Sequence, residues 1–410
     1  MVGRVEGSKL KNAGAKHLQR TLFHIFGRVR SDKCFPACIL PDSDSDRANE
    51  YRKSIRMLKS ASLSNFTSVP RGTWKFSPGL NVIVGENGLG KSHVLKALYS
   101  VLKSLTPDNA TVEGMSLEKL SKTQSEKRIA DELSGNLRPD TLGRLVKRQQ
   151  GRNKSEISLR FDDKNLDIDF SFATQSRSQV DITLMPTLHL RKTPVFIPTR
   201  ELITLSPWFV SLYDSYNVPF EKTWRDTVSL LGAPSLRGPR EAKVKDFLSP
   251  IEDAMGGTVE VDGHGRFFLK VNGGRMEAPL VAEGLRKFAM LARLISTGVL
   301  LEQGYLFWDE PETNLNPKLI KVLAKVIVDL SDQGIQVFVA THSTFLLREI
   351  AILTDGRKAK NSRYFGLVAS GNDDVSTLEQ GDSVEEIGTL VLLDEELAQS
   401  DRYMDAQADA

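Results

Sequence analysis

The residues best suited to chemistry are gathered in a glycine-rich segment at positions 85–92, which reads Gly-Glu-Asn-Gly-Leu-Gly-Lys-Ser. The segment matches the P-loop pattern G-x-x-x-x-G-K-[ST], and it lies between a predicted strand and a predicted helix. Its glycines allow backbone N–H groups to surround a phosphate, and the start of the helix adds positive potential. Lys91 is expected at the β- and γ-phosphates, and the Ser92 hydroxyl at Mg²⁺. The segment therefore predicts binding of ATP and Mg²⁺, with phosphate contacts from Gly85, Glu86, Asn87, Gly88, Leu89, Gly90, Lys91, Ser92 and His93.

Two adjacent carboxylates, Asp309 and Glu310, follow a second apolar run at positions 304–308. The run is short and almost wholly apolar, which is typical of a strand that is buried on both faces of a parallel sheet. The carboxyl ends of parallel strands meet at one edge of the sheet, so we expect both acids in the crevice that holds the P-loop. Asp309 is then predicted to hold Mg²⁺, directly or through water, and Glu310 to orient and deprotonate the attacking water.

A third candidate, His342, follows another apolar run at positions 335–340 and is one of six histidines in the chain. A lone histidine near the end of a strand is usually structural. Beside the two preceding motifs, a contact with the γ-phosphate is the better interpretation. The three motifs together predict an enzyme that hydrolyses ATP, with Glu310 and His342 as its catalytic residues.

The elements that must position these residues alternate between strands and helices. Apolar residues recur at helical spacing over 91–105, directly after the P-loop. We predict strands at 74–76, 81–84, 156–161, 166–172, 180–184, 194–197, 258–261, 267–271, 304–308, 335–340, 364–369 and 375–379, and helices within 205–256 and at 283–299, 317–331, 384–398 and from 343. This order predicts an α/β fold of the P-loop NTPase type, with a mixed sheet flanked by helices.

Composition excludes some classes of protein and leaves others open. The chain has 410 residues, and its 55 basic and 52 acidic residues give a net charge of +3, too near neutral to indicate nucleic-acid binding. No apolar run is long enough to cross a bilayer, so we expect no membrane association. Two cysteines, Cys34 and Cys38, favour free thiols and a cytoplasmic location. A basic group at 144–154 is either a solvated helix face or a contact to DNA; it comprises Arg144, Lys147, Arg148, Arg152 and Lys154.

The three motifs, in this order, resemble the ABC ATPase superfamily. The resemblance is strongest to its soluble branch: the structural-maintenance-of-chromosomes (SMC) ATPases, the RecF-like ATPases and the ATPase portion of overcoming-lysogenization-defect (OLD) nucleases. Positions 309–317, Asp-Glu-Pro-Glu-Thr-Asn-Leu-Asn-Pro, are similar to the D-E-P-E-x-x-L-x-P form of that branch. The segments at 63–66 and 76–85 also resemble it. The resemblance implies an ABC ATPase-like fold and a D-loop at Asn314, Leu315 and Asn316 that meets a partner subunit.

In this superfamily a signature motif contacts the ATP held by the other subunit. The matching positions here are Ala282, Glu283 and Gly284, where the serine and the first glycine of the family are replaced by Ala282 and Glu283. The start of the following helix can still bind phosphate in trans. Arg286 or Lys287 either compensates for the two missing residues or belongs to a plain basic helix face.

The domain organisation follows from these assignments. Residues 1–56 form an N-terminal extension, disordered or accessory, and residues 57–105 and 156–380 form the ABC-type ATPase domain. Residues 106–155 form a polar helical insertion between the P-loop and the signature, which we expect to be exposed. Residues 381–410 form an acidic C-terminal helix and tail, so any nuclease should be a separate protein.

The resemblance implies a dimerising, Mg²⁺-dependent ATPase that switches or drives a separate effector, such as a nuclease, in bacterial anti-phage defence. Its partners would be a second copy of the chain, in a homodimer or a larger homo-oligomer, and the effector protein. Two other functions stay open: a DNA-binding ATPase of repair or recombination, and an ATP-locked scaffold that does not hydrolyse. Intact Glu310 and His342 speak against the scaffold.

Overall fold

The structure is a computed structural model that describes residues 56–107, 121–148, 153–236, 239–300, 304–355, 361–369, 376–388 and 391–408. Apart from Arg56, the predicted extension at 1–56 lies outside these ranges, and with it Cys34 and Cys38. Parts of the insertion predicted at 106–155 also lie outside them. Among the helices of the described ranges, none has both the length and the apolar character that crossing a membrane requires.

The centre of the fold is a six-stranded sheet with the order β14-β13-β3-β12-β11-β7. Every neighbouring pair is parallel except β13 and β14, so the sheet is mixed, as predicted. All residues of β3, β11 and β12 are buried, which explains their near-continuous apolar sequences. The strands span Leu80–Gly85 (β3), Val195–Ile197 (β7), Tyr305–Asp309 (β11), Gln336–Thr341 (β12), Ser362–Ala369 (β13) and Ser376–Gly381 (β14).

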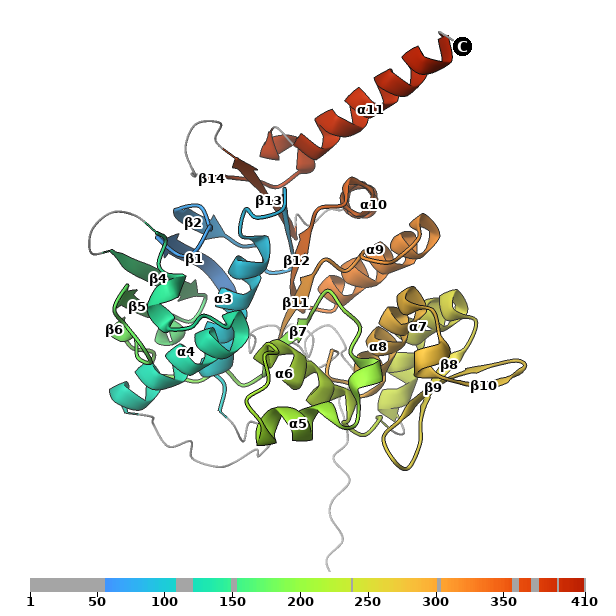
Figure 1. The fold of residues 1–410 in the computed structure, drawn as a ribbon, viewed down its shortest axis with the longest axis horizontal. Helices are drawn as coiled ribbons and strands as arrows, with labels where there is room; N and C mark the ends of the chain where they lie inside the picture. The colour runs from blue at the N-terminus through green and yellow to red at the C-terminus, as the bar shows by residue number, and fades with distance from the viewer. Residues whose placement is uncertain are drawn as a thin grey trace, which may run out of the picture. The chain divides into compact units, whose positions relative to one another are not determined.

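Alternate residues of the central strands belong to two separate hydrophobic cores. Val82, Leu306 and Val337 pack with α8 (Glu283–Ser296), α9 (Pro317–Asp332) and α10 (Thr344–Thr354), whereas Phe307 and Phe338 pack with α3 (Lys91–Ser104). Figure 1 shows α3 on one side of these strands and α9 and α10 on the other. The rings of Phe307 and Phe338 stack with centroids 4.8 Å apart, which joins β11 to β12 within one core.

A second, antiparallel sheet with the order β2-β1-β4-β5-β6 covers the α3 side of the central sheet. Four of its five strands were predicted from the sequence. The fifth, β1, was not predicted, although its residues alternate between buried and less buried positions. The strands span Leu58–Ser64 (β1), Gly72–Lys75 (β2), Lys154–Phe161 (β4), Ile168–Ala173 (β5) and Asp181–Leu184 (β6).

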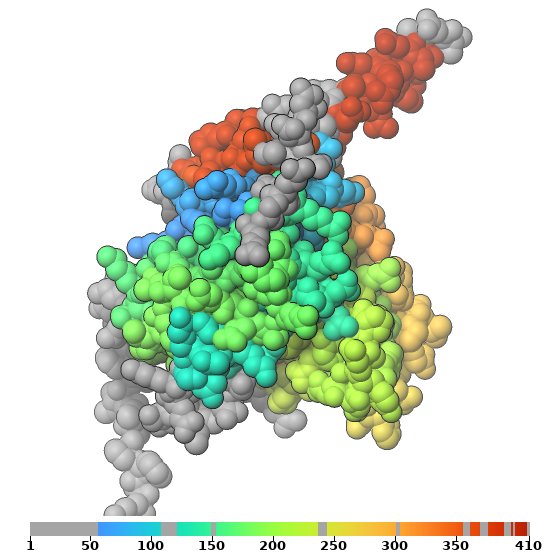
Figure 2. Space-filling view, turned by 60° about the vertical axis from the view of Figure 1, so that its left-hand side comes forward, coloured from blue at the N-terminus to red at the C-terminus, as the bar shows by residue number. Residues whose placement is uncertain are grey.

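The described part of the insertion differs from the exposed helix that the sequence suggested. Its helix α4 (Lys122–Leu137) packs on α3 and buries Ile129, Ala130 and Leu133. It also buries polar side chains whose partners lie far away in the sequence, such as Glu132, which is 2.6 Å from Lys222 Nζ. A polar composition therefore gave the wrong expectation of exposure. The described residues 121–148 and 153–184, turquoise to green in Figure 2, lie on the face shown there.

Most of the remaining elements lie on the α8 side or at the C-terminal end, whereas the 3₁₀ turns at 142–145 and 164–166 belong to the core on the α3 side. The strands predicted at 258–261 and 267–271 pair as an antiparallel hairpin. In its turn, Asp262 Oδ1 accepts hydrogen bonds from the N–H groups of His264 and Arg266, both 2.9 Å away. A third strand that was not predicted, β10, extends this hairpin. The elements span Phe209–Ser215 (α5), Lys222–Leu231 (α6), Pro239–Met255 (α7), Thr258–Val261 (β8), Phe267–Val271 (β9), Gly274–Glu277 (β10) and Val391–Ala408 (α11), with 3₁₀ turns at Leu142–Leu145 (η1), Lys164–Leu166 (η2), Ile203–Leu205 (η3), Ala278–Leu280 (η4) and Val384–Ile387 (η5).

One buried side chain, Gln336 at the start of β12, joins the two large sheets. Its Oε1 atom accepts a hydrogen bond from the Leu58 N–H at 3.0 Å. Its Nε2 group donates to the carbonyls of Leu58 and Ser77, both 2.8 Å away. Gln336 is 0% exposed, so water cannot replace these bonds if the amide is removed.

We therefore expect Gln336→Ala to lower the free energy of unfolding by about 2 kcal/mol, because buried backbone groups would lose their partners. Gln380→Ala is a matched control, since Gln380 also accepts from a backbone N–H, at Lys75, and donates to a backbone carbonyl, at Thr73, each at 3.0 Å, but at a site open to water. Urea denaturation of both variants measures the difference. Equal losses for the two variants would show that Gln336 does not join the sheets in this way.

Candidate active site

The P-loop connects the end of β3 to the start of α3, as the sequence predicted. Gly88 and Gly90 have φ values of +84° and +93°, which favour glycine over other residues. A Cβ atom at Gly90 would lie 3.1 Å from the backbone nitrogen of Val69, whereas one at Gly88 would meet nothing within 4 Å. Asn87 and Gly88 are exposed at the tip of the loop, so a phosphate can approach the loop there.

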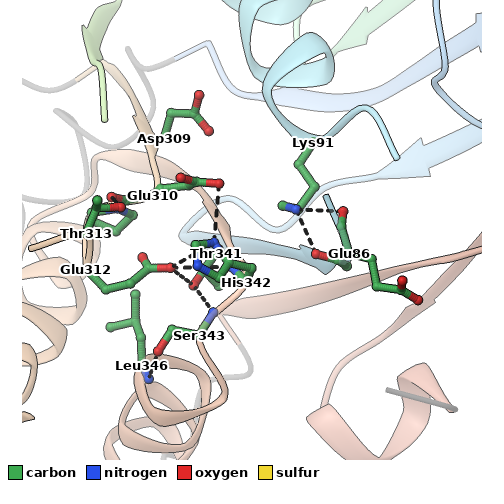
Figure 3. Close-up of polar contacts among 12 residues, drawn as sticks. Glu86, Lys91, Asp309, Glu310, Glu312, Thr313, Thr341, His342, Ser343 and Leu346 are labelled. Carbon is green, nitrogen blue, oxygen red and sulfur yellow. Dashed lines mark hydrogen bonds and ion pairs between the residues drawn. The ribbon is translucent and has the colours of Figure 1, made fainter. Parts of the chain in front are cut away.

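The Lys91 side chain lies along the inner side of this loop. Its Nζ group donates hydrogen bonds to the carbonyls of Gly85 at 2.7 Å and Glu86 at 2.9 Å (Figure 3). Burial lowers the pKa of Lys91, and the carboxylates at the end of β11 oppose that shift. The ammonium group therefore lies between the loop that should bind phosphates and the acids of β11.

The hydroxyl of Ser92 and the carboxylate of Asp309 meet at one edge of the central sheet, with Ser92 Oγ donating to Asp309 Oδ1 at 3.0 Å. Asp309 is only 6% exposed, and burial raises its pKa to about 6, although the hydrogen bond from Ser92 and the charge of Lys96 oppose this. A hydroxyl and a carboxylate are oxygen donors of the kind that Mg²⁺ prefers. The described residues contain no group of three or more His, Cys, Asp or Glu side chains that could hold a metal alone. The pair therefore fits a Mg²⁺ ion that is bound together with phosphate oxygens and water.

Glu310 and His342 lie beside this pair and remain partly open to solvent. His342 Nδ1 is 3.3 Å from Glu310 Oε1, and the two side chains are 43% and 24% exposed, respectively. The Glu310 N–H donates to Ala340 O at 2.9 Å, and its φ of +44° lies in the left-handed region. This uncommon backbone conformation turns Glu310 away from the course of β11 at the edge of the sheet. A carboxylate placed there can accept a proton from water.

Glu312 is a site residue to which the sequence analysis assigned no role. It is buried, and its Oε1 atom accepts hydrogen bonds from Thr341 Oγ1 at 2.7 Å and from the His342 N–H at 3.4 Å (Figure 3). Its Oε2 atom is buried without a hydrogen-bond partner among the described residues. Glu312 thus fixes the end of β12 against the turn after β11, which orients His342. Its position as the third acid of the Asp-Glu-Pro-Glu segment was the only signal in the sequence.

His93 and the predicted D-loop residues have contacts within the chain. His93 Nδ1 is 2.9 Å from Thr67 Oγ1, and burial lowers the pKa of His93. Asn314 is exposed, Leu315 packs against one of the cores, and the Asn316 side chain caps α9 by accepting from Leu319 N at 3.0 Å. Asn316 therefore has a structural role as a helix cap, whatever contact the D-loop makes with a partner.

The three predicted signature residues begin helix α8. Ala282 and Glu283 are exposed, whereas Gly284 packs against the D-loop of its own chain. A Cβ atom at Gly284 would lie 2.6 Å from Asn314 O, so any larger residue would displace the D-loop backbone. The glycine that survives from the signature pattern therefore has a packing role in this chain.

Neither interpretation that the sequence left open for Arg286 and Lys287 agrees with the structure. Arg286 Nε donates to Glu201 Oε1 at 2.8 Å, and Lys287 is 2% exposed with its ammonium group bonded to backbone carbonyls of the same chain. Neither side chain is a plain exposed face, and neither reaches outward in place of the missing signature residues. Glu201 also accepts from the Ile203 N–H at 3.0 Å and belongs to this structural cluster.

A cavity of about 860 Å³ opens beside the P-loop. It is lined by Thr67, Ser68, Gly88, Leu89, His93, Leu137, Arg138, Pro139, Asp140, Arg144, Leu145, Val146, Lys147, Arg148, Ala369 and Ser376. The described part of the basic group at 144–154 therefore contributes three of its residues to a hollow shared with the P-loop, and this position was not predicted.

Comparison with known proteins agrees with this geometry. Residues 80–348, more than half of the chain, match the model of a family described as "AAA domain, putative AbiEii toxin, Type IV TA system". The chain belongs to this AAA-domain family. The AAA-domain protein is also 24% identical over 330 residues to a protein of Helicobacter pylori (strain ATCC 700392 / 26695) named "ATP/GTP phosphatase", covering 70% of this chain and 85% of that relative.

The fold of this AAA-domain protein is similar to that of SMC head domains. A crystal structure of the Smc head domain with an extended coiled coil, bound to the C-terminal domain of ScpA and derived from Pyrococcus furiosus, aligns with a TM-score of 0.50 and 14% identity. The alignment covers 84% of this chain and 100% of that chain. The predicted P-loop NTPase fold is confirmed, and it is like the fold of SMC head domains. The family match makes the protein an AAA-type ATPase.

The buried charge of Asp309 leads to a prediction about stability. The pKa of Asp309 is about 6 in the folded protein against 3.8 ordinarily, so the folded state holds more protons between these values and loses stability as pH rises through them. Without nucleotide, Asp309→Asn should therefore be more stable than the parent at pH 7 to 8, by up to about 3 kcal/mol, with a smaller gain at pH 5.

Urea denaturation at both pH values measures this gain. Asp262→Asn is the control and should lower the stability instead of raising it. Hydrogen bonds from the backbone of Arg266 lower the pKa of Asp262 to about 2, so its charged form stabilises the hairpin. A loss of stability at pH 8 for Asp309→Asn would show that Asp309 is not a buried, poorly compensated charge.

Proposed function

We propose that this protein hydrolyses ATP with Mg²⁺ at a site that a second copy of the chain completes, and that the resulting change controls a separate effector protein. The observation that carries the proposal is the 3.0 Å contact between Ser92 and Asp309, because it joins the P-loop to the acids of β11. The groups proposed to bind phosphate, to hold Mg²⁺ and to accept the proton then lie at the same edge of the central sheet.

The residues of this edge have complementary roles in the proposed reaction. The P-loop backbone and Lys91 bind the phosphates, while Ser92 and Asp309 hold Mg²⁺, which neutralises charge on the phosphate oxygens when bound. Glu310 accepts a proton from the attacking water. His342, oriented by Glu312, lies 3.3 Å from Glu310 and contacts the γ-phosphate. This pairing favours hydrolysis over the alternative of an ATP-locked scaffold.

The face that holds Glu310 supports the participation of a second copy. A groove of about 740 Å³ runs along it and is lined by Glu310, Glu312, Thr313, Asn314, His342, Ser343, Thr344, Phe345, Glu395, Glu396, Gln399 and Arg402. The start of α8, with exposed Ala282 and Glu283, is the surface proposed to reach the nucleotide of the partner. The carboxylate of Glu283 already interacts favourably with the helix N-terminus, so we expect this contact to be weaker than one with serine and glycine there.

The cavity beside the P-loop supports nucleotide binding rather than DNA binding by the basic group. We propose that the ribose and the base of ATP enter this cavity beside Thr67, Leu89 and His93, where Arg144 and Lys147 also line it. Positive charge in a hollow next to the phosphates favours a nucleotide, whereas DNA requires an open basic surface. The name of the Helicobacter relative adds GTP as a second substrate to be tested.

The role of an effector rests on the relatives. The family description names a toxin of a Type IV TA system, and the Smc head domain was solved in complex with ScpA. We propose that this protein likewise acts on a separate partner, such as a nuclease-like effector of anti-phage defence. Its catalytic chemistry does not depend on that assignment.

We expect Lys91→Ala to weaken ATP binding by at least about a hundredfold, because a buried ammonium group next to the phosphates would be lost. Fluorescence titration with a labelled ATP analogue in Mg²⁺ measures the affinity. Lys325→Ala removes an exposed lysine of α9 and should leave the affinity unchanged. Normal affinity in Lys91→Ala would contradict the P-loop assignment.

We expect Glu310→Gln to bind ATP with normal affinity but to lower kcat by about 10² to 10⁴, because its amide cannot accept the proton. Mass photometry of this variant with ATP and Mg²⁺ should show a dimer that disappears when EDTA removes the metal. Glu260→Gln, on the exposed strand β8, is the control and should behave as the parent. A normal kcat would rule out Glu310 as the base, and a monomer at saturating ATP would rule out the shared site.

A further inference from the structure

We propose that Lys287 is a positioning residue that holds Glu310 in its hydrolytic orientation and ties it to the start of α8. The proposal rests on the proposed function of Glu310 as the base. It concerns a side chain that points into the protein and would touch neither ATP nor water. Figure 3 shows the turn that Lys287 stabilises, with Glu310 and Thr313 labelled.

The contacts of Lys287 are concentrated on one turn. Its Nζ group donates to Thr313 O at 2.9 Å and to the carbonyls of Glu310 and Pro311, both at 3.3 Å. Three carbonyl dipoles therefore converge on a single ammonium group. Without a positive charge at their centre these dipoles would repel one another, so the turn would open or would have to be filled by water.

The turn needs such support because its backbone is strained. Glu310 and Asn314, at the two ends of the turn, have φ values of +44° and +64°, a region that residues other than glycine seldom adopt. Such residues persist where surrounding contacts hold them in place. The N–H of Glu310 is held by Ala340 O and its carbonyl by Lys287, so both peptide groups that define its conformation are fixed.

The burial of the Lys287 side chain indicates that it has a specific role. A lysine that is 2% exposed costs free energy compared with an apolar residue of the same length. The hydrogen bonds of Lys287 are to main-chain carbonyls, so its ammonium group is not held by an ordinary ion pair. The carboxylates of Glu312, Glu283 and Glu310 nevertheless favour its charged form, while burial lowers its pKa to about 8. The ammonium group therefore lies in the electrostatic field of the catalytic acids.

The same side of α8 carries Gly284, three residues before Lys287 and therefore on the same helix face. Gly284 packs against Asn314, the last residue of the turn. Helix α8 thus contacts the turn at both ends, and a movement of its first residues would move the backbone of Glu310. A second copy that docks on the start of α8 could alter hydrolysis through this connection.

A double-mutant cycle tests the proposal. Lys287→Met keeps the apolar stem and removes the ammonium group. We expect it to lower kcat by about tenfold to a hundredfold through displacement of Glu310, with the ATP dissociation constant changed by less than about threefold. In the Glu310→Gln background, Lys287→Met should cause no further loss, since the residue through which it acts is already disabled. Single-turnover hydrolysis of γ-labelled ATP measures all four proteins.

Arg293→Met is the matched control, because Arg293 also lies on α8 and donates to backbone carbonyls, at Leu231 and Ala233, away from the turn. It should lower the melting temperature and leave kcat nearly unchanged in both backgrounds. If Lys287→Met does not fold, as judged by circular dichroism, the cycle is repeated with Lys287→Gln.

The results separate the two proposals. An unchanged kcat for the Lys287 variant, or the same fold loss in both backgrounds, would overturn the positioning role while Glu310 stays the base. A normal rate for Glu310→Gln alone would instead overturn the proposed function.

Discussion

The hydrogen bond between Ser92 and Asp309 is the contact on which the site depends. It joins the first turn of α3 to the end of β11, two segments that are 217 residues apart in the chain. The contact exists because β3, β12 and β11 are parallel neighbours, so that the P-loop, His342 and Asp309 all follow the same ends of adjacent strands. A register shift in any of these strands would separate the phosphate-binding loop from its acids.

Charge balance around these acids is a second constraint. The carboxylates of Asp309, Glu310 and Glu312 lie in the fields of two buried ammonium groups, Lys91 from the P-loop and Lys287 from α8. The two lysines are far apart in the sequence and have different contacts. Lys91 faces the loop proposed to bind phosphate, and Lys287 faces the backbone carbonyls of the turn that follows the acids. Placing three acids together thus required cations on both sides of the turn.

The sequence predicted those parts of the fold and the site whose signals are local. The P-loop, the acids after β11 and His342 after β12 were found because each follows an apolar strand, and the structure brings them together. The burial of α4 and the inward direction of Lys287 were not predicted, since both depend on partners distant in the chain: Lys222 for Glu132, and the carbonyls of Glu310, Pro311 and Thr313 for Lys287. From sequence alone, a polar or basic residue is expected to be exposed unless its buried partner is known. The roles of Ala282 and Glu283 toward a second copy stay predictions, because one chain contains only half of that contact.

The buried amide of Gln336 has a consequence for the nucleotide as a whole. Strand β12 starts with this amide and ends next to His342, while the strand it holds, β1, leads to Thr67 and Ser68 in the cavity. The groups proposed to contact the terminal phosphate and the base therefore follow β12 and β1, respectively. Gln336 joins these two strands at their opposite ends. We therefore expect the contacts of Gln336 to influence the distance between these groups from the opposite edge of the central sheet.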